Sequence, residues 1–400
     1  MNRMSSSSLL LLLALLAASS TAEDTTPFST RMIESVMARQ HGVVSSGAKT
    51  STLEAGMLTL AIQSWLGLYH DRTDGTQVAT FASYADAILA ATSHLFPNAS
   101  VAAAMPLDRL TIAQALQAPY KQQQPSVEET ATLATLERSL CVQRRNQFNG
   151  FWYYVYPNWS YIDGAVSLLP YMAATPSWSD NDLLVQLQLL YMCTYNRATA
   201  LLTHGYDASK TAVWADRVTG ASALVWCRSL GWYVTGLVNA WEQLDGCRAR
   251  TNATTCARVA TELQRQANQL CTQIVTYADA ATGAWYQLPT CGPTPGNFLE
   301  SSCTMLFTFA ILKGLRLGLL TDNAAGLQAT ALRAYNYTVT SGTFVVPERN
   351  GTLTWNGTVA VCSLNSSATY EYYVNRPVIL NHALGEAAFI LASVEVERLT

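Results

Sequence analysis

The sequence predicts an all-α fold, an (α/α) barrel in which helical hairpins close around one cleft. Apolar residues recur at three- and four-residue steps in many separate segments of the chain. Hydrophobic residues make up 50% of the 400 residues and charged residues only 13%, which favours a large buried core. Because no Pro-, Gly- or Ser-rich linker separates these segments, we expect a single domain.

The helical pattern continues from the N-terminal to the C-terminal part of the chain. Its long stretches are, in order, 52–70, 78–96, 128–143, 180–202, 230–244, 256–278, 299–320 and 380–399. Strand-like patches are short, mainly 342–347 and 358–364. About a dozen helices of ordinary length fit a closed ring of hairpins. An α-solenoid is the alternative, but the sequence shows no fixed repeat of about 34 or 40 residues.

The first 22 residues predict a secretory signal peptide. Arg3 gives a positive start, residues 9–18 form an apolar stretch, and residues 20–22 resemble a small-residue cleavage site. We therefore expect a secreted, extracellular protein whose mature chain, residues 23–400, forms one domain.

Charge and motifs exclude several classes of partner and reaction. The net charge of −3 without a basic cluster argues against nucleic acid. The apolar run 305–320 is interrupted by Lys313 and Arg316, so a buried helix is expected there and no membrane span. The absence of GxSxG, GxGxxG and P-loop sequences argues against acyl transfer, dinucleotide chemistry and phosphoryl transfer. Nothing in the sequence implies an obligatory protein partner.

Sequons and cysteines agree with an extracellular location. The Asn-x-Ser/Thr sequons stand at Asn98, Asn158, Asn252, Asn336, Asn350, Asn356 and Asn365. In an oxidising compartment most of the nine cysteines should pair; Cys247 with Cys256 and Cys291 with Cys303 are plausible local loops, although spacing does not fix the pairing. Because no CxxC or Cys/His cluster has zinc-like spacing, we expect no metal and no other cofactor.

The connection HGYDASKTAVWADRVTGAS (204–222) combines ionisable and aromatic residues, among them His204 and Trp214. Long connections of this composition are usually functional. A single histidine is nevertheless more often structural, so the pattern leaves the role of His204 open. Ser222 is the expected N-cap of the next helix.

That helix contains VWCRSLGWY (225–233), in which Arg228 lies between Trp226 and Trp232. A buried guanidinium needs an anion, because an unpaired one costs several kcal/mol. Indole faces beside a fixed arginine suit an acidic sugar, which stacks on the rings and offers its carboxylate. The alternative is that the tryptophans belong to the core and Arg228 caps a helix or pairs with Asp216. The residue types alone leave both open.

Two aspartates precede apolar helical runs. Asp163 lies in YPNWSYIDGAVSLLPYMA (156–173), and Asp108 lies in MPLDRLTIAQAL (105–116). A carboxylate at a helix start commonly caps the helix or is favoured by its dipole, and this is the simpler interpretation of both. An aspartate among aromatic rings, such as Asp163, can instead have a raised pKa and act as a general acid.

Together these segments resemble the unsaturated rhamnogalacturonyl hydrolases of glycoside hydrolase family 105, which are related to family 88. The resemblance is carried by residues 204–233 and by YIDGAVSLLPYMA, LESSCTMLFTFAILKGLRLGLL and EYYVNRPVILNHALGEAAFILASVE. It covers nearly the whole mature chain. It implies an (α/α)6 barrel of six helical hairpins with short strand-like loops.

The resemblance also implies a reaction on oligosaccharides that polysaccharide lyases produce, whose terminal uronate has a C4–C5 double bond. A carboxylic acid protonates C4 and water adds at C5. The hemiketal then opens and releases the next sugar. On this basis Asp163 is expected to be the general acid/base, and Asp108 its partner carboxylate, with one proton shared by the pair.

The resemblance assigns the remaining candidates to substrate binding. His204 would hydrogen-bond the sugar or the attacking water, and Arg228 would hold the uronate carboxylate. The walls would be formed by Trp226, Trp232 and Trp214. Departures from the family pattern at Leu53, Tyr171, Ala223 and Asn381-His382 leave both aspartates in place and bear on the identity of the substrate.

The unsaturated rhamnogalacturonan disaccharide is the expected substrate. One alternative is the same chemistry on an unsaturated glucuronyl substrate. Another is an inverting glycosidase, which needs its two carboxylates about 6.5–9.5 Å apart. A carbohydrate-binding protein without turnover is the alternative from a different class, although binding alone does not require Asp108 and Asp163 together.

Overall fold

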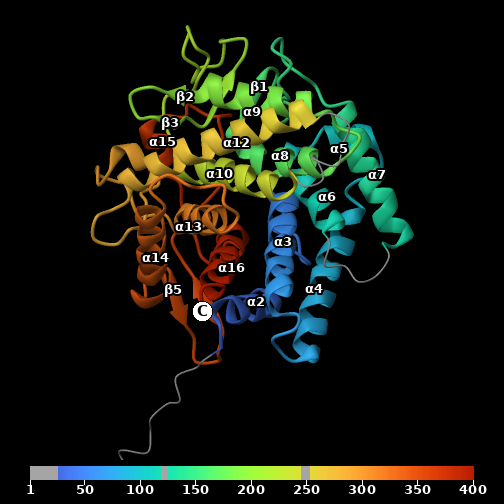
Figure 1. Cartoon of the computed structure of the whole chain (residues 1–400), viewed down its shortest axis with the longest axis vertical. Coiled ribbons are helices and arrows are strands. Elements are labelled where there is room, and N and C mark those ends of the chain that lie inside the picture. The colour runs from blue at the N-terminus through green and yellow to red at the C-terminus, as the bar shows by residue number, and fades with distance from the viewer. Residues whose placement is uncertain (1–25, 119–124, 245–252) are drawn as a thin grey trace, which may run out of the picture.

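The computed structural model describes residues 26–118, 125–244 and 253–400. The predicted signal peptide lies outside these residues. Within them the molecule is largely helical, with short strands in the connections (Figure 1). None of the described helices combines the length and apolar character needed to cross a membrane.

Six helices form a closed ring, each packed against the next and the last against the first. Their bounds are α3 (Ser51–Tyr69), α6 (Leu110–Gln117), α8 (Ala165–Ala174), α10 (Cys227–Glu242), α13 (Ser301–Arg316) and α16 (Ala383–Glu397). These helices are buried on nearly all sides; in α13 every residue from Ser301 to Gly314 is buried. A helix surrounded by other helices must be apolar all round, as these are. The contact between α16 and α3 closes the ring and excludes the solenoid.

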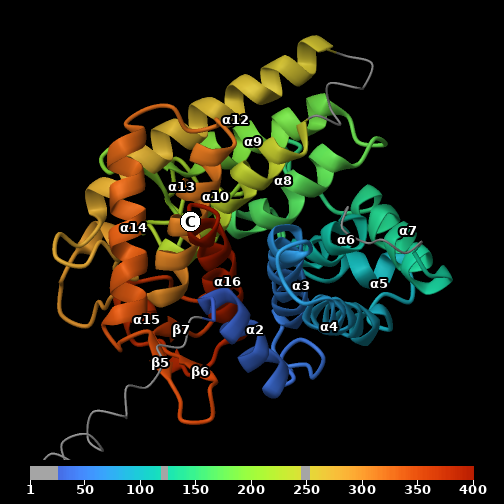
Figure 2. The same cartoon turned by 60° about the horizontal axis from the view of Figure 1, so that its bottom comes forward.

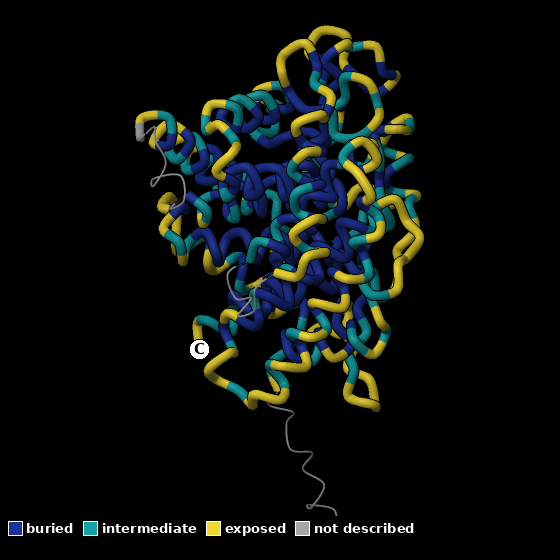
Figure 3. The backbone as a smooth tube through the Cα atoms, turned by 90° about the vertical axis from the view of Figure 1, so that its right-hand side faces the viewer, coloured by how far each residue is buried: buried dark blue, intermediate teal, exposed yellow. Residues whose placement is uncertain are grey.

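One outer helix covers each member of the ring. In ring order from α3 these are α4 (Gly75–Ser93), α7 (Val127–Cys141), α9 (Asp180–Thr194), α12 (Ala253–Ile274), α14 (Ala324–Thr340) and α2 (Phe28–Ala38). Figure 2 shows α3, α10 and α16 in the middle and α4, α12 and α14 around them. Figure 3 shows the same division as a buried interior and an exposed periphery. The expected (α/α)6 barrel is thereby confirmed.

The short elements lie in the connections. Helices α5 (Ala99–Ala103) and α15 (Tyr370–Val374) are single turns. Four antiparallel pairs join β1 (Trp159–Tyr161) to β4 (Gly205–Asp207), β2 (Tyr195–Asn196) to β3 (Leu201–Leu202), β5 (Val345–Pro347) to β6 (Leu353–Trp355), and β7 (Thr358–Val359) to β8 (Val378–Ile379). The pair β1–β4 joins the Asp163 segment to the His204 segment.

Two local expectations were wrong. The helix expected over 180–202 ends at Thr194, because the Asn196 side chain accepts hydrogen bonds from the Ala198 and Thr199 amides and turns the chain into the β2–β3 hairpin. Ser222 does not cap α10, which begins at Cys227; its hydroxyl instead accepts a hydrogen bond from the Gly205 amide.

The close contact of α8 with α10 gives a stability prediction. A Cβ on Gly236 of α10 would overlap the Ala165 carbonyl of α8, whereas a Cβ on Gly67 of α3 meets nothing within 4 Å. We expect Gly236→Ala to lower the free energy of unfolding by roughly 1–3 kcal/mol, because backbone atoms cannot easily move aside. Gly67→Ala, the control, should raise it by about 0.5–1 kcal/mol. Urea unfolding measures both, and equal effects would contradict the packing.

Candidate active site

Residues at or just before the N-terminal ends of five inner helices, α3, α6, α8, α10 and α16, line a cavity of about 350 Å³. Its lining includes Leu53 of α3, Leu384 of α16 and Arg228 of α10, together with Asp108 and Asp163 just before α6 and α8. A separate depression of about 650 Å³ lies at the opposite ends of the same helices. The predicted acids and arginine therefore share one end of the barrel.

The depression at the opposite end has a different character, because its charges are paired with one another. Lys313 Nζ lies 2.8 Å from Glu242 Oε2, and Arg316 Nη2 lies 2.7 Å from Glu395 Oε1. A larger depression of about 700 Å³ lies against α4, with Val78, Ala82 and Leu89 in its lining. Neither places a pair of buried aspartates against aromatic rings, which is why the 350 Å³ cavity is the candidate site.

Neither aspartate caps its helix. Each lies in one turn of 3-10 helix, Leu107–Arg109 before α6 and Ile162–Gly164 before α8, and neither turn nor helix receives a side-chain cap there. The simpler interpretation of these residues as caps is therefore wrong. The turns instead direct both carboxyl groups to the cavity.

Asp108 is completely buried, and its Oδ2 accepts a hydrogen bond of 2.6 Å from the Tyr153 hydroxyl. Burial raises the pKa of Asp108 to about 7; the Tyr153 hydrogen bond opposes this rise and the nearby Asp163 adds to it. Asp108 therefore holds a proton in a large fraction of molecules near neutral pH. The sequence did not indicate Tyr153 as its partner.

Asp163 is more accessible, with 10% of its side chain exposed. Its Oδ2 lies 3.2 Å from Nε2 of His204, whose Nδ1 is 2.7 Å from the Tyr373 hydroxyl. Burial raises the pKa of Tyr373 well above its usual value, so this hydroxyl stays protonated. The imidazole therefore lies between the Tyr373 hydroxyl on its Nδ1 side and the Asp163 carboxylate on its Nε2 side.

His204 itself is fully buried between Tyr161 and Trp226, with ring centroids 5.4 and 4.8 Å away. Its side chain does not line the cavity, so the expected direct contact with sugar or water is replaced by contact with Asp163. The structure therefore places His204 behind Asp163, away from the cavity.

Arg228 lines the cavity, but its guanidinium already has an ion-pair partner and hydrogen-bond acceptors inside the protein. Nη1 donates to the Val359 carbonyl at 2.6 Å and lies 3.5 Å from Glu300 Oε1, and Nη2 donates to the Ala360 carbonyl at 2.9 Å. Its guanidinium also lies 4.8 Å from the Trp226 ring centroid. Within the described part of the chain, no acceptor bonds its Nε.

The sequence left open whether Arg228 pairs with an internal carboxylate or with a ligand. The structure shows an internal partner, which is Glu300 and not the expected alternative Asp216. Asp216 lies in a turn and accepts hydrogen bonds from the Val218 and Thr219 amides. The expectation that the guanidinium waits unpaired for a uronate was therefore wrong, and only its Nε and the second N–H of Nη2 are left without a partner among the described residues.

Glu300 is the functional neighbour that sequence reasoning missed. Its carboxylate accepts hydrogen bonds from the Cys303 and Val359 amides at 2.7 and 3.0 Å and from the Ser302 hydroxyl. Burial raises the pKa of Glu300, and Arg228 opposes that rise. A signal was present, because Glu300 is the one acidic residue in the apolar segment 299–320.

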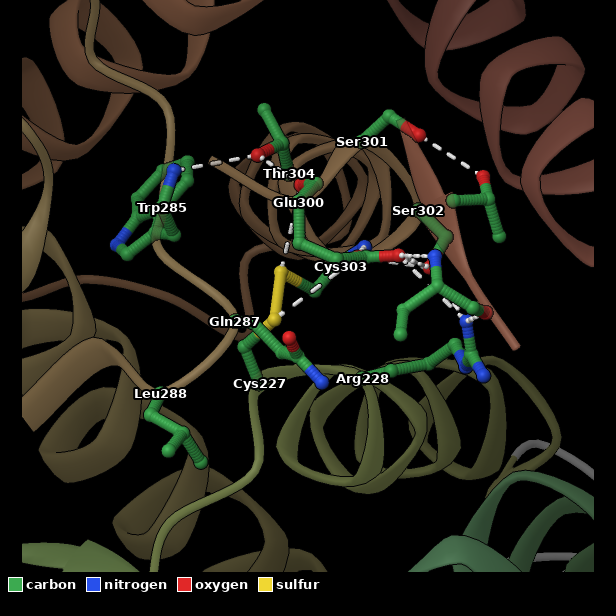
Figure 4. Close-up of a disulfide and its surroundings, with 12 residues drawn as sticks. Cys227, Arg228, Trp285, Gln287, Leu288, Glu300, Ser301, Ser302, Cys303 and Thr304 are labelled. Carbon is green, nitrogen blue, oxygen red and sulfur yellow. Dashed lines mark hydrogen bonds and ion pairs between the residues drawn. A yellow bond between two sulfur atoms is a disulfide. The ribbon is translucent and has the colours of Figure 1, made fainter. Parts of the chain in front are cut away.

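A disulfide between Cys227 and Cys303 ties the first turns of α10 and α13 together beside this pair (Figure 4). It replaces the expected Cys291–Cys303 pair, and Cys291 is a free thiol. Cys256 is disulfide-bonded, as expected, but its proposed partner Cys247 lies outside the described residues.

The tryptophans separate into two groups. Trp226 and Trp232 line the cavity, as expected of its walls. Trp214 does not; it is buried and packs edge-on against Trp159, with ring centroids 5.2 Å apart. The expectation that Trp214 forms a wall of the substrate site was therefore wrong, because the loop folds inward and adds Trp214 to the core.

The burial of Asp108 predicts a pH-dependent gain in stability for Asp108→Asn. Because the pKa of Asp108 is higher in the folded protein, the unfolded chain loses this proton at a lower pH, and the wild-type free energy of unfolding falls between about pH 4 and pH 7 and is constant above it. Asparagine does not ionise, so Asp108→Asn should be more stable than wild type by up to about 4 kcal/mol. Urea unfolding at pH 5 to 8 should show that the difference in free energy of unfolding between variant and wild type grows up to pH 7. Asp71→Asn on the surface should show none, and a constant gap for Asp108→Asn would contradict the assignment.

The disulfide predicts a second effect on stability. Cys227 and Cys303 are 76 residues apart in sequence. Replacing both by serine should lower the free energy of unfolding by about 4 kcal/mol, since the unfolded chain regains the entropy of that loop. Cys141→Ser, which changes an exposed free thiol, is the control and should have little effect. Similar unfolding midpoints for the two variants would show that the disulfide adds nothing.

Comparison with known proteins agrees with this architecture. Solved structures similar to this chain include a family 105 glycoside hydrolase from C. acetobutylicum (TM-score 0.77, 24% identity, 93% of this chain and 100% of that one). Another is the unsaturated glucuronyl hydrolase from Bacillus sp. GL1 (TM-score 0.64, 11% identity, 92% and 95% covered). At these identities the likeness shows the fold.

Sequence comparison adds the family. The chain is 28% identical over 204 residues to the 24.9 kDa protein in the picA locus of Rhizobium radiobacter, covering 50% of this chain and 82% of that protein. The family model described as Glycosyl Hydrolase Family 88 matches residues 30–400. A match over nearly the whole described chain establishes membership, and the chain belongs to glycosyl hydrolase family 88.

Proposed function

We propose that this protein is a secreted hydrolase of unsaturated uronyl oligosaccharides, acting on the terminal unsaturated galacturonyl residue of rhamnogalacturonan lyase products. One observation carries the proposal: two carboxyl groups, of which Asp108 has a pKa of about 7, meet in a cavity walled by aromatic rings. Such a pair can hold one proton at neutral pH and deliver it to a carbon atom.

Asp163 is the group that transfers the proton. It is the more exposed of the two acids, and His204 holds one of its oxygens from behind. In the proposed reaction Asp163 gives its proton to C4 of the sugar. Water then adds its oxygen to C5 and returns a proton to the Asp163 carboxylate. The sum is the addition of one water across the C4–C5 double bond.

The product of this addition is a hemiketal at C5, which opens the ring without further help from an acid residue. The C5–O5 bond breaks as the proton of the new C5 hydroxyl moves to O5, which gives a ketone at C5 and a hydroxyl on C1. C1 is then a hemiacetal that bears the glycosidic oxygen, and its collapse to an aldehyde releases the next sugar. The glycosidic bond is therefore broken without a nucleophile at C1.

Other groups of the cavity would place the sugar. The faces of Trp226 and Trp232 provide apolar walls, and Nε and the second N–H of Nη2 of Arg228 are donors for the uronate carboxylate. Secretion is supported by the predicted leader and by the Cys227–Cys303 disulfide, since such bonds persist in oxidising compartments. The same chemistry on an unsaturated glucuronyl substrate is the second candidate, supported by the match to the family 88 model.

Loss of ultraviolet absorbance by the conjugated uronate tests the proposal. The protein should remove the absorbance of lyase-digested rhamnogalacturonan, and Asp163→Asn should slow this by about 10²-fold or more while remaining folded. Turnover should also fall above pH 7, because Asp108 then loses the shared proton. Asp71→Asn is the control.

Three outcomes separate the candidates. Activity on glucuronyl lyase products alone would favour the second candidate. Unchanged absorbance on both classes of substrate would refute hydration. Full activity of Asp163→Asn would show that another group supplies the proton.

A further inference from the structure

The mouth of the cavity carries two cations that the proposed reaction does not use. Lys49, in the connection before α3, and Arg376, just after α15, both contribute to the lining. Lys49 is exposed and Arg376 is half-buried, whereas the acids that line the cavity, Asp108 and Asp163, are buried. The cavity is therefore acidic at its base and basic at its rim.

Both rim cations are held over aromatic rings. Lys49 Nζ lies 5.9 Å from the ring centroid of Tyr154, and the Arg376 guanidinium lies 5.7 Å from that of Tyr372. Both tyrosines also line the cavity. A ring face holds a cation in place without using its N–H groups, so these donors remain available to a ligand.

Neither cation has an anionic partner among the residues that the structure describes. Arg376 also has a buried Nε without a hydrogen-bond acceptor in that part of the chain. A buried donor without an acceptor costs about 1–3 kcal/mol and calls for an explanation. Arg228, deeper in the same cavity, differs because its charge is paired with Glu300.

We propose that Lys49 and Arg376 bind a second anionic group of the substrate, on a sugar beyond the bond that is broken. This rests on the proposed function. The uronate carboxylate is attached to C5, next to the carbon that receives the proton from Asp163, and it must therefore lie deep in the cavity. An anion at the rim must belong to the leaving-group side. The preferred substrate is then an acidic oligosaccharide longer than a neutral-ended disaccharide, or one whose second sugar is sulfated.

Binding to the Asp163→Asn variant tests this without turnover. The first pair of probes is the unsaturated galacturonyl–rhamnose disaccharide and the corresponding tetrasaccharide, whose third sugar is a second galacturonate. The second pair is the unsaturated chondroitin disaccharide with and without a 6-sulfate. In each pair the measured quantity is the ratio of the two Kd values from isothermal titration, which isolates the added anion.

We expect the added anion to tighten binding by about fivefold to tenfold in at least one pair at low salt, and by less at high salt. Lys49→Gln together with Arg376→Gln should bring that ratio close to one. The control Arg349→Gln removes an exposed cation from the β5–β6 turn and should leave the ratio unchanged.

The outcomes are distinct. A response in the first pair identifies a carboxylate, and a response in the second identifies a sulfate. Ratios near one for the parent variant, or ratios that the double substitution leaves unchanged, would overturn the rim assignment even when the disaccharides bind and wild type turns them over. Binding of none of the four probes, together with unchanged ultraviolet absorbance, would overturn the proposed function as well.

Discussion

The buried carboxylate of Glu300 is the group on which the geometry of this site depends. An ionised side chain that is buried away from water needs several hydrogen-bond or ion-pair partners. Glu300 receives them from three parts of the chain. The Cys303 amide comes from its own helix, the Val359 amide from β7, and the Arg228 guanidinium from α10. Removing one partner of such a pair costs about 3–5 kcal/mol, because the other charge stays buried alone. The pair thus fixes α10, α13 and the β7 connection relative to one another.

Burial decides the protonation of Asp108 against several opposing influences, one of which is the positive charge of Arg109. The Tyr153 hydrogen bond stabilises its carboxylate, and a helix N-terminus also favours negative charge, by about 0.3–1 kcal/mol and at most about 2. The rise of its pKa to about 7 corresponds to about 4 kcal/mol in the other direction. Desolvation is therefore the larger effect. The 3-10 turn before α6 matters for this reason: it places the carboxyl group in a dry interior beyond the reach of capping contacts.

The sequence predicted the fold and the two acids better than their surroundings. The long apolar periods of α3, α10 and α13 follow from burial on all sides, whereas Asp108 and Asp163 were singled out as acids by the resemblance to family 105 and not by their local pattern. Arg228 was recognised, but its partner Glu300 lies 72 positions further along the chain, and no local spacing reports such a contact. The same holds for Cys227 and Cys303. The failures at Asn196 and Ser222 are local, because a side-chain hydrogen bond there outweighs helical propensity.

The buried base and the exposed rim of the cavity are two different electrostatic environments. This difference limits how strongly charges at each end can interact with a substrate. Two unit charges 4 Å apart interact by about 1 kcal/mol in water and by about 4 kcal/mol at an effective dielectric constant of 20. The strong interactions at the base are already made within the protein by Arg228, Glu300 and the acid pair. Those at the rim, around Lys49 and Arg376, are weaker and solvent-screened. Such charges raise association rates and add modestly to the affinity for a ligand that carries a matching anion. The base therefore determines the chemistry, while the rim can distinguish among oligosaccharides that present the same unsaturated end.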